Sequence, residues 1–311
     1  MTALAHSSIW FENHGLLFRA PFLISGLNET DPPTHAGRSD VDIVHGKVPT
    51  EEAGSRMAGE HEIRGADIVL EISGTGRFLM QDGRRIVVDA QKNADQGLVR
   101  AFVAGPAIAI LLHQRRAMPL HASCVSRNGG AIAFVGDSEA GKSTTAMLFS
   151  KAGYDILSDD IITIRQREKL AMVNPANRSA KLWDDAARML QVDDVLTEPE
   201  YPGTAKKLVT PSSGPSTPQR LDAIFILRWL YPHDMAPEVR RLEALDALGQ
   251  LRKNIYRPDL VKVLGLEGAY MSKLADLVRT TPTYVLARPR SDVRLPDIPG
   301  IVAGAIGLQS C

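Results

Sequence analysis

One short segment constrains the fold more than any other. Residues 136–143 read Gly-Asp-Ser-Glu-Ala-Gly-Lys-Ser, which fits the pattern G-x-x-x-x-G-K-[ST]. The apolar run 131–135 leads directly into it, a helix is expected from about 142 to 152, and a second apolar run follows at 155–157. A strand, a glycine-rich loop, a helix and a strand in this order predict an α/β unit built on a sheet.

In loops of this pattern the backbone N–H groups wrap phosphate groups at a helix N-terminus. The two glycines, Gly136 and Gly141, allow a sharp turn and a close approach of the backbone to the ligand. Lys142 is expected to bridge the β- and γ-phosphates, and the Ser143 hydroxyl to ligate Mg²⁺. The sequence therefore predicts a site for ATP or GTP with Mg²⁺, formed by Gly136, Asp137, Ser138, Glu139, Ala140, Gly141, Lys142, Ser143 and Thr144.

Two adjacent carboxylates, Asp159 and Asp160, follow the second apolar run. Ligand chemistry collects at the carboxyl ends of strands in an open α/β sheet, so both should lie near the glycine-rich loop. One carboxylate could accept a proton from a hydroxyl nucleophile while its neighbour engages Mg²⁺. The alternative is a solvated Asp-Asp turn after a strand.

Together with His121-Ala-Ser-Cys-Val125 and Ile156-Leu-Ser-Asp-Asp160, the loop resembles the catalytic domain of bacterial HPr serine kinase/phosphorylase. The chain is more similar to the HPr-kinase-like proteins of lasso-peptide biosynthesis clusters, through the segments Leu120-His-Ala-Ser123, Leu157-Ser-Asp-Asp160, Leu182-Trp183 and Asn254-Ile-Tyr-Arg257. The resemblance covers about residues 65–290. The stretch 174–183 departs from the HPr kinases, which carry a glycine-rich motif there.

The resemblance implies a P-loop kinase that phosphorylates a serine hydroxyl. The acceptor would be the C-terminal residue of a lasso-peptide precursor, or a small phosphocarrier protein in the HPr branch, where phosphorolysis reverses the reaction. It also implies that Asp159 is the proton acceptor, that Asp160 is its Mg²⁺-side partner, and that His121 lies close to the phosphates. A packed residue at a strand end is the other interpretation of His121.

A transferring phosphoryl group needs positive charge beyond Mg²⁺ and the loop lysine. Arg178 and Lys181 are favoured because they follow the aspartates within one short connection. The aromatic residues Trp183 and Tyr256 could form a peptide-binding wall or pack in the core. Further basic candidates are Lys206, Lys207, Arg252 and Arg257.

The expected fold class is α/β, with an HPr-kinase-like P-loop domain at 116–311 preceded by a smaller strand-rich α+β module at 1–115. The module should contain hairpins at 8–24 and 76–88, a helix over about 94–116 interrupted near Gly105-Pro106, and a polar loop at about 27–62. The P-loop domain should contain strands at 222–229 and 283–287, helices near 181–191, 243–255 and 268–279, and a flexible loop at 210–218.

The composition limits which kinds of partner and which compartment can be expected. Lys+Arg and Asp+Glu are 36 each, so no global field is expected to hold nucleic acid or an anionic membrane. The two cysteines, Cys124 and Cys311, suit a reducing compartment, and the apolar stretch 101–112 is too short to span a bilayer. With no secretion signal at the N-terminus, these features predict a cytoplasmic protein and leave a homo-oligomer open.

Other functions remain open at this point. A small-molecule kinase would keep the same loop and change only the acceptor. An ATPase or GTPase switch would transfer phosphate to water, but the Leu-Ser-Gly-Gly-like signature of transporter ATPases is absent. Glu139 stands where a glycine is usual, and a carboxylate near a triphosphate could leave a nucleotide-binding scaffold without activity.

Overall fold

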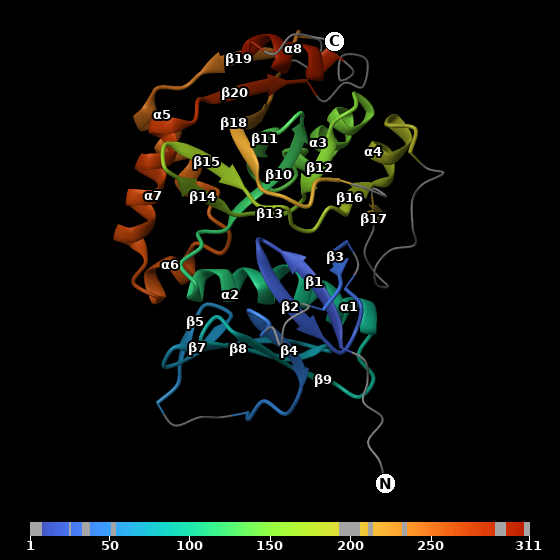
Figure 1. Ribbon diagram of the computed structural model, residues 1–311, viewed down its shortest axis with the longest axis vertical. Coiled ribbons are helices and arrows are strands. Elements are labelled where there is room, and N and C mark those ends of the chain that lie inside the picture. Colours follow the sequence, from blue (N-terminus) through green and yellow to red (C-terminus); the bar gives the residue numbers. More distant parts are fainter. Residues whose placement is uncertain are drawn as a thin grey trace. The chain divides into compact units, whose positions relative to one another are not determined.

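The computed structural model describes residues 8–24, 26–32, 38–50, 54–192, 206–210, 214–231, 235–289 and 297–307. These residues form two compact units of mixed α/β structure, each with its own large sheet (Figure 1). The first unit holds residues up to 117 together with 257–266. The remaining described residues, including the whole glycine-rich loop, belong to the second unit.

The sheet of the first unit has nine strands in the order β3-β1-β2-β4-β9-β8-β7-β6-β5. Neighbouring strands are antiparallel except for the pairs β2–β4 and β4–β9, which are parallel. The strands are β1 (Ile9–Asn13), β2 (Leu16–Ala20), β3 (Asn28–Thr30), β4 (Val41–His45), β5 (Arg56–Ala58), β6 (His61–Arg64), β7 (Asp67–Ile72), β8 (Gly76–Gln81) and β9 (Arg85–Ala90).

Both expected hairpins are present, as β1–β2 and β8–β9. Their turns contain His14-Gly15 and Asp82-Gly83, and all four residues have a positive φ, between 47° and 69°. The β1–β2 connection has two residues and the β8–β9 connection has three, Asp82 to Arg84. Positive φ values in such turns match the right-handed twist of the strands they join, and Asp or Gly tolerates the left-handed conformation.

The polar loop expected at 27–62 is wrong where the described residues form strands β3, β4 and β5 and the start of β6. Turn and loop residues connect these strands, and 33–37 and 51–53 lie outside the described residues. Strand β4 lies between β2 and β9, with Val41 and Ile43 buried and Asp42 paired with Arg19 at 2.8 Å. Such short strands carry too few apolar residues for their period of two to stand out between polar neighbours.

The expected interrupted helix is confirmed as α1 (Gln96–Phe102), the π-helical segment η1 (Val103–Ala107) and α2 (Ile108–Gln114). Pro106 lies inside η1, where the wider turn accommodates the missing N–H. By length and composition Gln96–Gln114 could cross a membrane, but 67% of it is buried inside the protein, as in a core helix. Segments η1 and α2 both contact β8.

The main sheet of the second unit is also nine-stranded, and α3 (Lys142–Lys151) contacts its strands β10, β11 and β12. The path β12-β10-β11-β18-β15-β14 carries β13 beside β10, and β20 and then β19 beside β18. The strands are β10 (Leu120–Arg127), β11 (Gly130–Val135), β12 (Asp155–Ser158), β13 (Ile161–Ile162), β14 (Ile164–Arg167), β15 (Leu170–Val173), β18 (Gln219–Trp229), β19 (Glu238–Arg241) and β20 (Thr283–Arg288).

The directions of the strands show at which edge of this sheet a ligand is expected to bind. Strands β11, β18 and β20 are parallel, and β12 runs the same way because both it and β11 are antiparallel to β10. The carboxyl ends of all four strands therefore lie at one edge. Beneath it, Phe134 of β11 packs against Phe149 of α3 and Phe225 of β18, with ring centroids 5.0 and 6.2 Å apart.

The helix expected near 181–191 begins later than predicted. Residues 180–183 form strand β16 (Ala180–Trp183), paired with β17 (Lys206–Val209), and the helix α4 covers Asp184–Met189. Ala180 and Leu182 are buried at alternate positions, so pairing with β17 prevails over the local helical preference. The other helices are α5 (Ala244–Lys253), α6 (Asp259–Val263), α7 (Glu267–Thr280) and α8 (Ile298–Ala305).

The sequence predicts a domain boundary at 115/116, with all later residues in the P-loop domain. In the structure residues 257–266, which include α6, belong to the first unit instead. There Arg257 contacts Glu60 and His61, and Asp259 lies 3.2 Å from His61. Of the loop expected at 210–218, residues 211–213 lie outside the described part of the chain.

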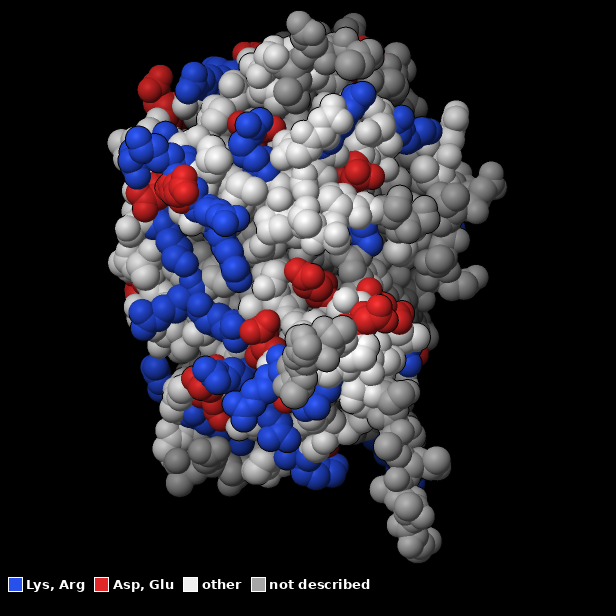
Figure 2. All heavy atoms as spheres, viewed as in Figure 1, with Lys and Arg blue, Asp and Glu red and all other residues white. Residues whose placement is uncertain are grey.

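Charged side chains of both signs cover the face in Figure 2. Basic side chains gather on the side of the second unit where α5, α7 and the β14–β15 hairpin lie, and the hairpin contributes the exposed residues Arg165, Arg167 and Lys169. A neutral chain can thus carry a locally basic face.

Candidate functional site

The glycine-rich loop joins the carboxyl end of β11 to the first turn of α3. Gly141 has a φ of 83°, and a Cβ there would collide with the guanidinium of Arg288 and lie 3.4 Å from the Trp229 ring. Glycine is therefore required at 141 both for conformation and for space. Glu139 has a φ of 63°, in the left-handed region that favours glycine. This backbone conformation explains why glycine is the usual residue at this position of the loop.

Lys142 is folded back over the loop. Its buried ammonium group donates to the carbonyl oxygens of Gly136 at 2.9 Å and Asp137 at 3.0 Å. Burial lowers the pKa of Lys142, while the charges of Asp160 and Asp159 oppose that shift. The lysine holds the loop closed on itself in this state.

The start of the loop is fastened by Asn254, the residue that caps the C-terminus of α5. Its Oδ1 accepts the N–H of Gly136 at 2.9 Å, and its Nδ2 donates to the carbonyl of Gln250 at 2.9 Å. Asn254 also accepts the N–H of His121 through its own carbonyl, at 2.8 Å. The sequence singled out the segment 254–257 only through the resemblance, and the structure gives Asn254 a positioning contact.

Asp159 is 3% exposed and its two carboxylate oxygens accept different hydroxyl groups. Ser143 donates to Oδ2 at 2.8 Å, and Ser123 of β10 donates to Oδ1. The backbone N–H of Lys181 approaches Oδ2 at 3.4 Å. Burial raises the pKa of Asp159 and the charge of Asp160 adds to it, against the opposing hydrogen bonds from the two serines.

Asp160 is the more accessible carboxylate, with 37% of its side chain exposed. Its φ of 75° is in the left-handed region, which Asp tolerates better than most residues, and Oδ1 lies 3.2 Å from Nε2 of His121. Burial alone would raise the pKa of Asp160, but the hydrogen bond and charge of His121 and the charges of Lys181 and Lys142 bring it below its usual range.

His121 lies in β10, and its ring meets the edge of Tyr256 at 5.6 Å between centroids. Burial and the charge of Asp160 raise the pKa of Tyr256. The tyrosine therefore stays neutral beside the Asp160–His121 pair.

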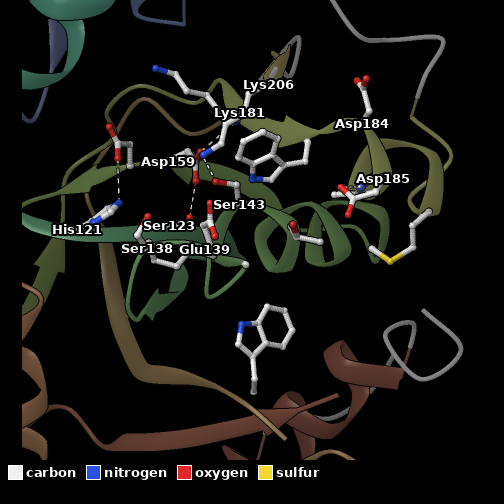
Figure 3. Close-up of a pocket in the computed structure, with 18 of the residues that line it drawn as sticks. His121, Ser123, Ser138, Glu139, Ser143, Asp159, Lys181, Asp184, Asp185 and Lys206 are labelled. Atoms are coloured by element: carbon white, nitrogen blue, oxygen red, sulfur yellow. Dashed lines mark hydrogen bonds and ion pairs between the residues drawn. The ribbon is translucent and has the colours of Figure 1, made fainter. Parts of the chain in front are cut away.

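The loop, the two aspartates, Ser123 and His121 border one pocket of the second unit (Figure 3). Its lining includes most of the predicted residues of the loop and both aspartates, whereas Gly136, Asp137 and Ala140 do not line it. Asp137 is exposed, 3.9 Å from Arg228, and Ala140 is buried. The predicted residues at the pocket are His121, Ser138, Glu139, Gly141, Lys142, Ser143, Thr144, Asp159, Asp160, Lys181, Trp183 and Lys206.

Arg178 is not brought to this pocket. A Cβ at Gly214 would collide with its guanidinium, so Arg178 packs against the segment at 214 instead. Lys181 does line the pocket, and so does Lys206, whose ammonium group lies 5.1 Å from the ring of Trp183. Lys207 is paired with Asp184 at 3.2 Å, and Arg252 is exposed.

Trp183 is 42% exposed and faces the pocket, whereas its neighbour Leu182 is buried in the core. The alternation along β16 separates the two side chains to opposite faces. Of the aromatic residues proposed for a wall, Trp183 borders the pocket and Tyr256 stands behind His121.

Four residues of α4 that line the pocket, Asp184, Asp185, Ala186 and Met189, were missed from the sequence. So were Trp229 and Arg288. They are the last residues of β18 and β20 and are opposite each other in the parallel register. Their position after apolar strands, like that of Asp159, was the signal that could have found them.

The oxygen donors at Ser143 and Asp159 are of the kind Mg²⁺ prefers, and they lie within hydrogen-bond distance of each other. Across the described part of the chain no group of three or more His, Cys, Asp or Glu residues could hold a metal. These residues therefore suit a Mg²⁺ ion that is bound by one hydroxyl, one or two carboxylates and the phosphates of the ligand. They do not suit an ion bound by protein side chains alone.

No protein-family model matches the chain, and no curated protein matches it. Among solved structures, the HPr(Ser) kinase/phosphatase from Coxiella burnetii is a weak neighbour, with a TM-score of 0.31 and 11% sequence identity. The match covers 61% of this chain and 96% of that one.

Proposed function

We propose that this protein is a phosphotransferase, a kinase that moves the terminal phosphoryl group of ATP or GTP to a hydroxyl group. One observation carries the proposal. A glycine-rich loop with Lys142 and Ser143 opens into the same pocket as a buried Asp159 bonded to Ser143 and an accessible Asp160 paired with His121.

The loop and the first turn of α3 bind the triphosphate. Backbone N–H groups at a helix N-terminus attract phosphate oxygens. Lys142 leaves the carbonyls of Gly136 and Asp137 and turns to the β- and γ-phosphates, which are stronger acceptors for a buried ammonium group. The exchange also removes the cost of holding that charge against neutral carbonyls.

Ser143 and Asp159 are the residues that would hold Mg²⁺ with the phosphates, and the ion would supply positive charge to the transferring group. Asp159 suits this role because it is buried, fixed by two serines and already next to the Ser143 hydroxyl. This assignment is the reverse of the one that the resemblance implies, which put Asp160 on the Mg²⁺ side.

Asp160 receives the proton. The acceptor hydroxyl binds beside its exposed carboxylate, its O–H proton passes to Asp160, and its oxygen forms a bond to the γ-phosphorus. The bond from that phosphorus to the bridging oxygen breaks, and the nucleoside diphosphate leaves with the electron pair. His121 keeps Asp160 ionised and oriented from the other side.

The acceptor is proposed to be a serine of a peptide, the C-terminal residue of a lasso-peptide precursor as the resemblance suggests. One wall of the pocket is consistent with a peptide ligand. It consists of the exposed Trp183 with Lys181 and Lys206 beside it. An exposed aromatic ring with flanking cations suits a chain that ends in a carboxylate. A small phosphocarrier protein is the alternative acceptor.

The test is intact-mass analysis of precursor peptide and phosphocarrier protein after incubation with the enzyme, ATP and Mg²⁺. A phosphate adduct formed by the wild type and lost in Asp160→Asn supports the kinase. Release of ADP without an adduct on either acceptor would contradict a peptide or protein kinase and favour a small-molecule kinase or an ATPase.

One feature favours a second function, nucleotide binding without transfer. Glu139 is exposed at the pocket and would repel a triphosphate. Binding of ATP with neither ADP release nor an adduct, for all acceptors, would establish that alternative.

A further inference from the structure

Trp229 and Arg288 line the pocket but have no part in the chemistry above. The guanidinium carbon of Arg288 lies 4.5 Å from the centre of the Trp229 ring, a stacked cation–π pair. The pair forms where two neighbouring parallel strands end, because Trp229 and Arg288 share one register position. The ends of these two strands lie at the edge where ligands bind in such sheets.

Arg288 is built in firmly. It is 1% exposed, and its Nη2 donates to the carbonyls of Ala140 and Gly141, each at 3.1 Å. Burial lowers its pKa to about 10, and among the described residues its Nε has no hydrogen-bond partner. A buried cation with an unsatisfied N–H destabilises a fold, and such groups are typical of functional sites.

The pair also lies on a definite side of the loop. Strand β11, which carries the loop, has β10 and β12 on one side and β18 and β20 on the other. His121, Ser123 and the aspartates come from the first side, and Trp229 and Arg288 from the second. A nucleoside triphosphate laid across the loop with its γ-phosphate at the aspartates therefore has its base directed to the second side.

We propose that Trp229 is the stacking platform for the nucleobase of the nucleoside triphosphate, and that Arg288 is the positioning residue that fixes the indole against Gly141. This inference rests on the proposed function. The indole is 3.4 Å from where a Cβ of Gly141 would be, so its ring borders the loop that binds the phosphates. Stacking on an aromatic ring binds any base, because every base has a π face.

The first experiment compares ATP with inorganic tripolyphosphate, which has the phosphates but no base, by calorimetry with the full chain. Trp229→Leu should weaken ATP binding by about 5-fold to 150-fold, the range for base–aromatic stacking, and leave tripolyphosphate binding unchanged. Trp229→Phe should retain most of the ATP affinity, because a ring remains. Trp10→Phe, in the first unit, is the control that should change neither ligand.

Fluorescence gives a second readout, since the chain has three tryptophans, Trp10, Trp183 and Trp229. In a variant that keeps Trp229 as its single tryptophan, ATP should quench the tryptophan fluorescence and tripolyphosphate should not.

Two results would overturn the inference while the proposed function stands. In one, Trp229→Leu weakens ATP and tripolyphosphate equally, which would make Trp229 a support of the loop. In the other, only Trp183 responds to ATP. Failure of the wild type to bind either ligand would instead remove the proposed function itself.

Discussion

The hydroxyl of Ser143, in the first turn of α3, donates a 2.8 Å hydrogen bond to the buried carboxylate of Asp159, which follows β12. The residues are sixteen apart, and a helix and a strand separate them. A buried carboxylate held by two hydroxyl groups is costly for folding, so its presence at the mouth of a phosphate-binding loop indicates a role in ligand chemistry.

Asp159→Asn should raise the melting temperature at neutral pH and abolish phosphoryl transfer. The pKa of Asp159 is raised in the folded state, so its ionised form opposes folding, and the amide removes that charge while keeping an acceptor for a serine. The stabilisation should shrink as pH falls through the raised folded pKa toward the unfolded value, because the wild-type carboxyl then becomes neutral. Thermal melts from neutral to acidic pH measure this; a lower melting temperature throughout would show that Asp159 is structural.

The same variant should weaken Mg²⁺ binding to the nucleotide complex by at least about 10-fold to 100-fold, the range seen when only a group that supports a metal ligand is lost. Titration of Mg²⁺ at fixed ATP measures it, with Asp160→Asn as the matched comparison. If Asp160→Asn loses Mg²⁺ and Asp159→Asn does not, the assignment implied by the resemblance holds and ours is wrong.

Asp160→Asn should keep ATP and Mg²⁺ binding and reduce turnover by about 10²-fold to 10⁴-fold, as for loss of a general base. Asn tolerates the φ of 75°, so folding should be unaffected. Because the pKa of Asp160 is below its usual range, the wild-type carboxylate should stay active to lower pH than a free aspartate would. In His121→Ala the support from His121 is lost, so the acidic limb of the kcat/KM profile should move upward in pH; an unmoved limb would separate His121 from Asp160.

Glu139→Gly and Glu139→Gln separate charge from backbone strain in the loop. Both remove a carboxylate from the pocket, and each should tighten ATP binding by about fivefold, equivalent to about 1 kcal/mol. Only Glu139→Gly should also raise the melting temperature, because it relieves the left-handed conformation at φ 63°. Equal ATP affinity in all three proteins would show that the Glu139 carboxylate points away from the phosphates.

Gly141→Ala should destabilise the protein by about 1–3 kcal/mol and abolish ATP binding, because the added Cβ strains the backbone and displaces Arg288. Gly153→Ala is the matched control: its φ of 84° is nearly the same as that of Gly141, but no atom lies within 4 Å of the added Cβ. Chemical denaturation and calorimetry compare the two. Similar losses in both variants would mean that only conformation, and not the contact with Arg288, requires glycine at 141.

Much of the local structure was predictable because its signals are contained in adjacent residues. The turn at Asp82-Gly83 fixes a hairpin by its own backbone preferences, and the apolar run before Gly136 fixes the strand that carries the loop. Strand β4 was missed, although its buried Val41 and Ile43 alternate, because five residues between polar segments give too weak a period. Residues 181–183 were assigned to a helix because nothing local reveals their pairing with 206–208.

The sequence by itself determined the loop, its lysine and serine, and the pair of aspartates, since these depend on residue type and short spacing. The tertiary structure decided which aspartate contacts Ser143 and which contacts His121, because a turn with Asp160 at a φ of 75° sends the two carboxylates in different directions. It also brought Arg288 beneath a loop about 150 residues earlier and left Arg178 outside the pocket. Such contacts depend on strand order and register, which join segments remote in sequence and leave no local pattern to be read.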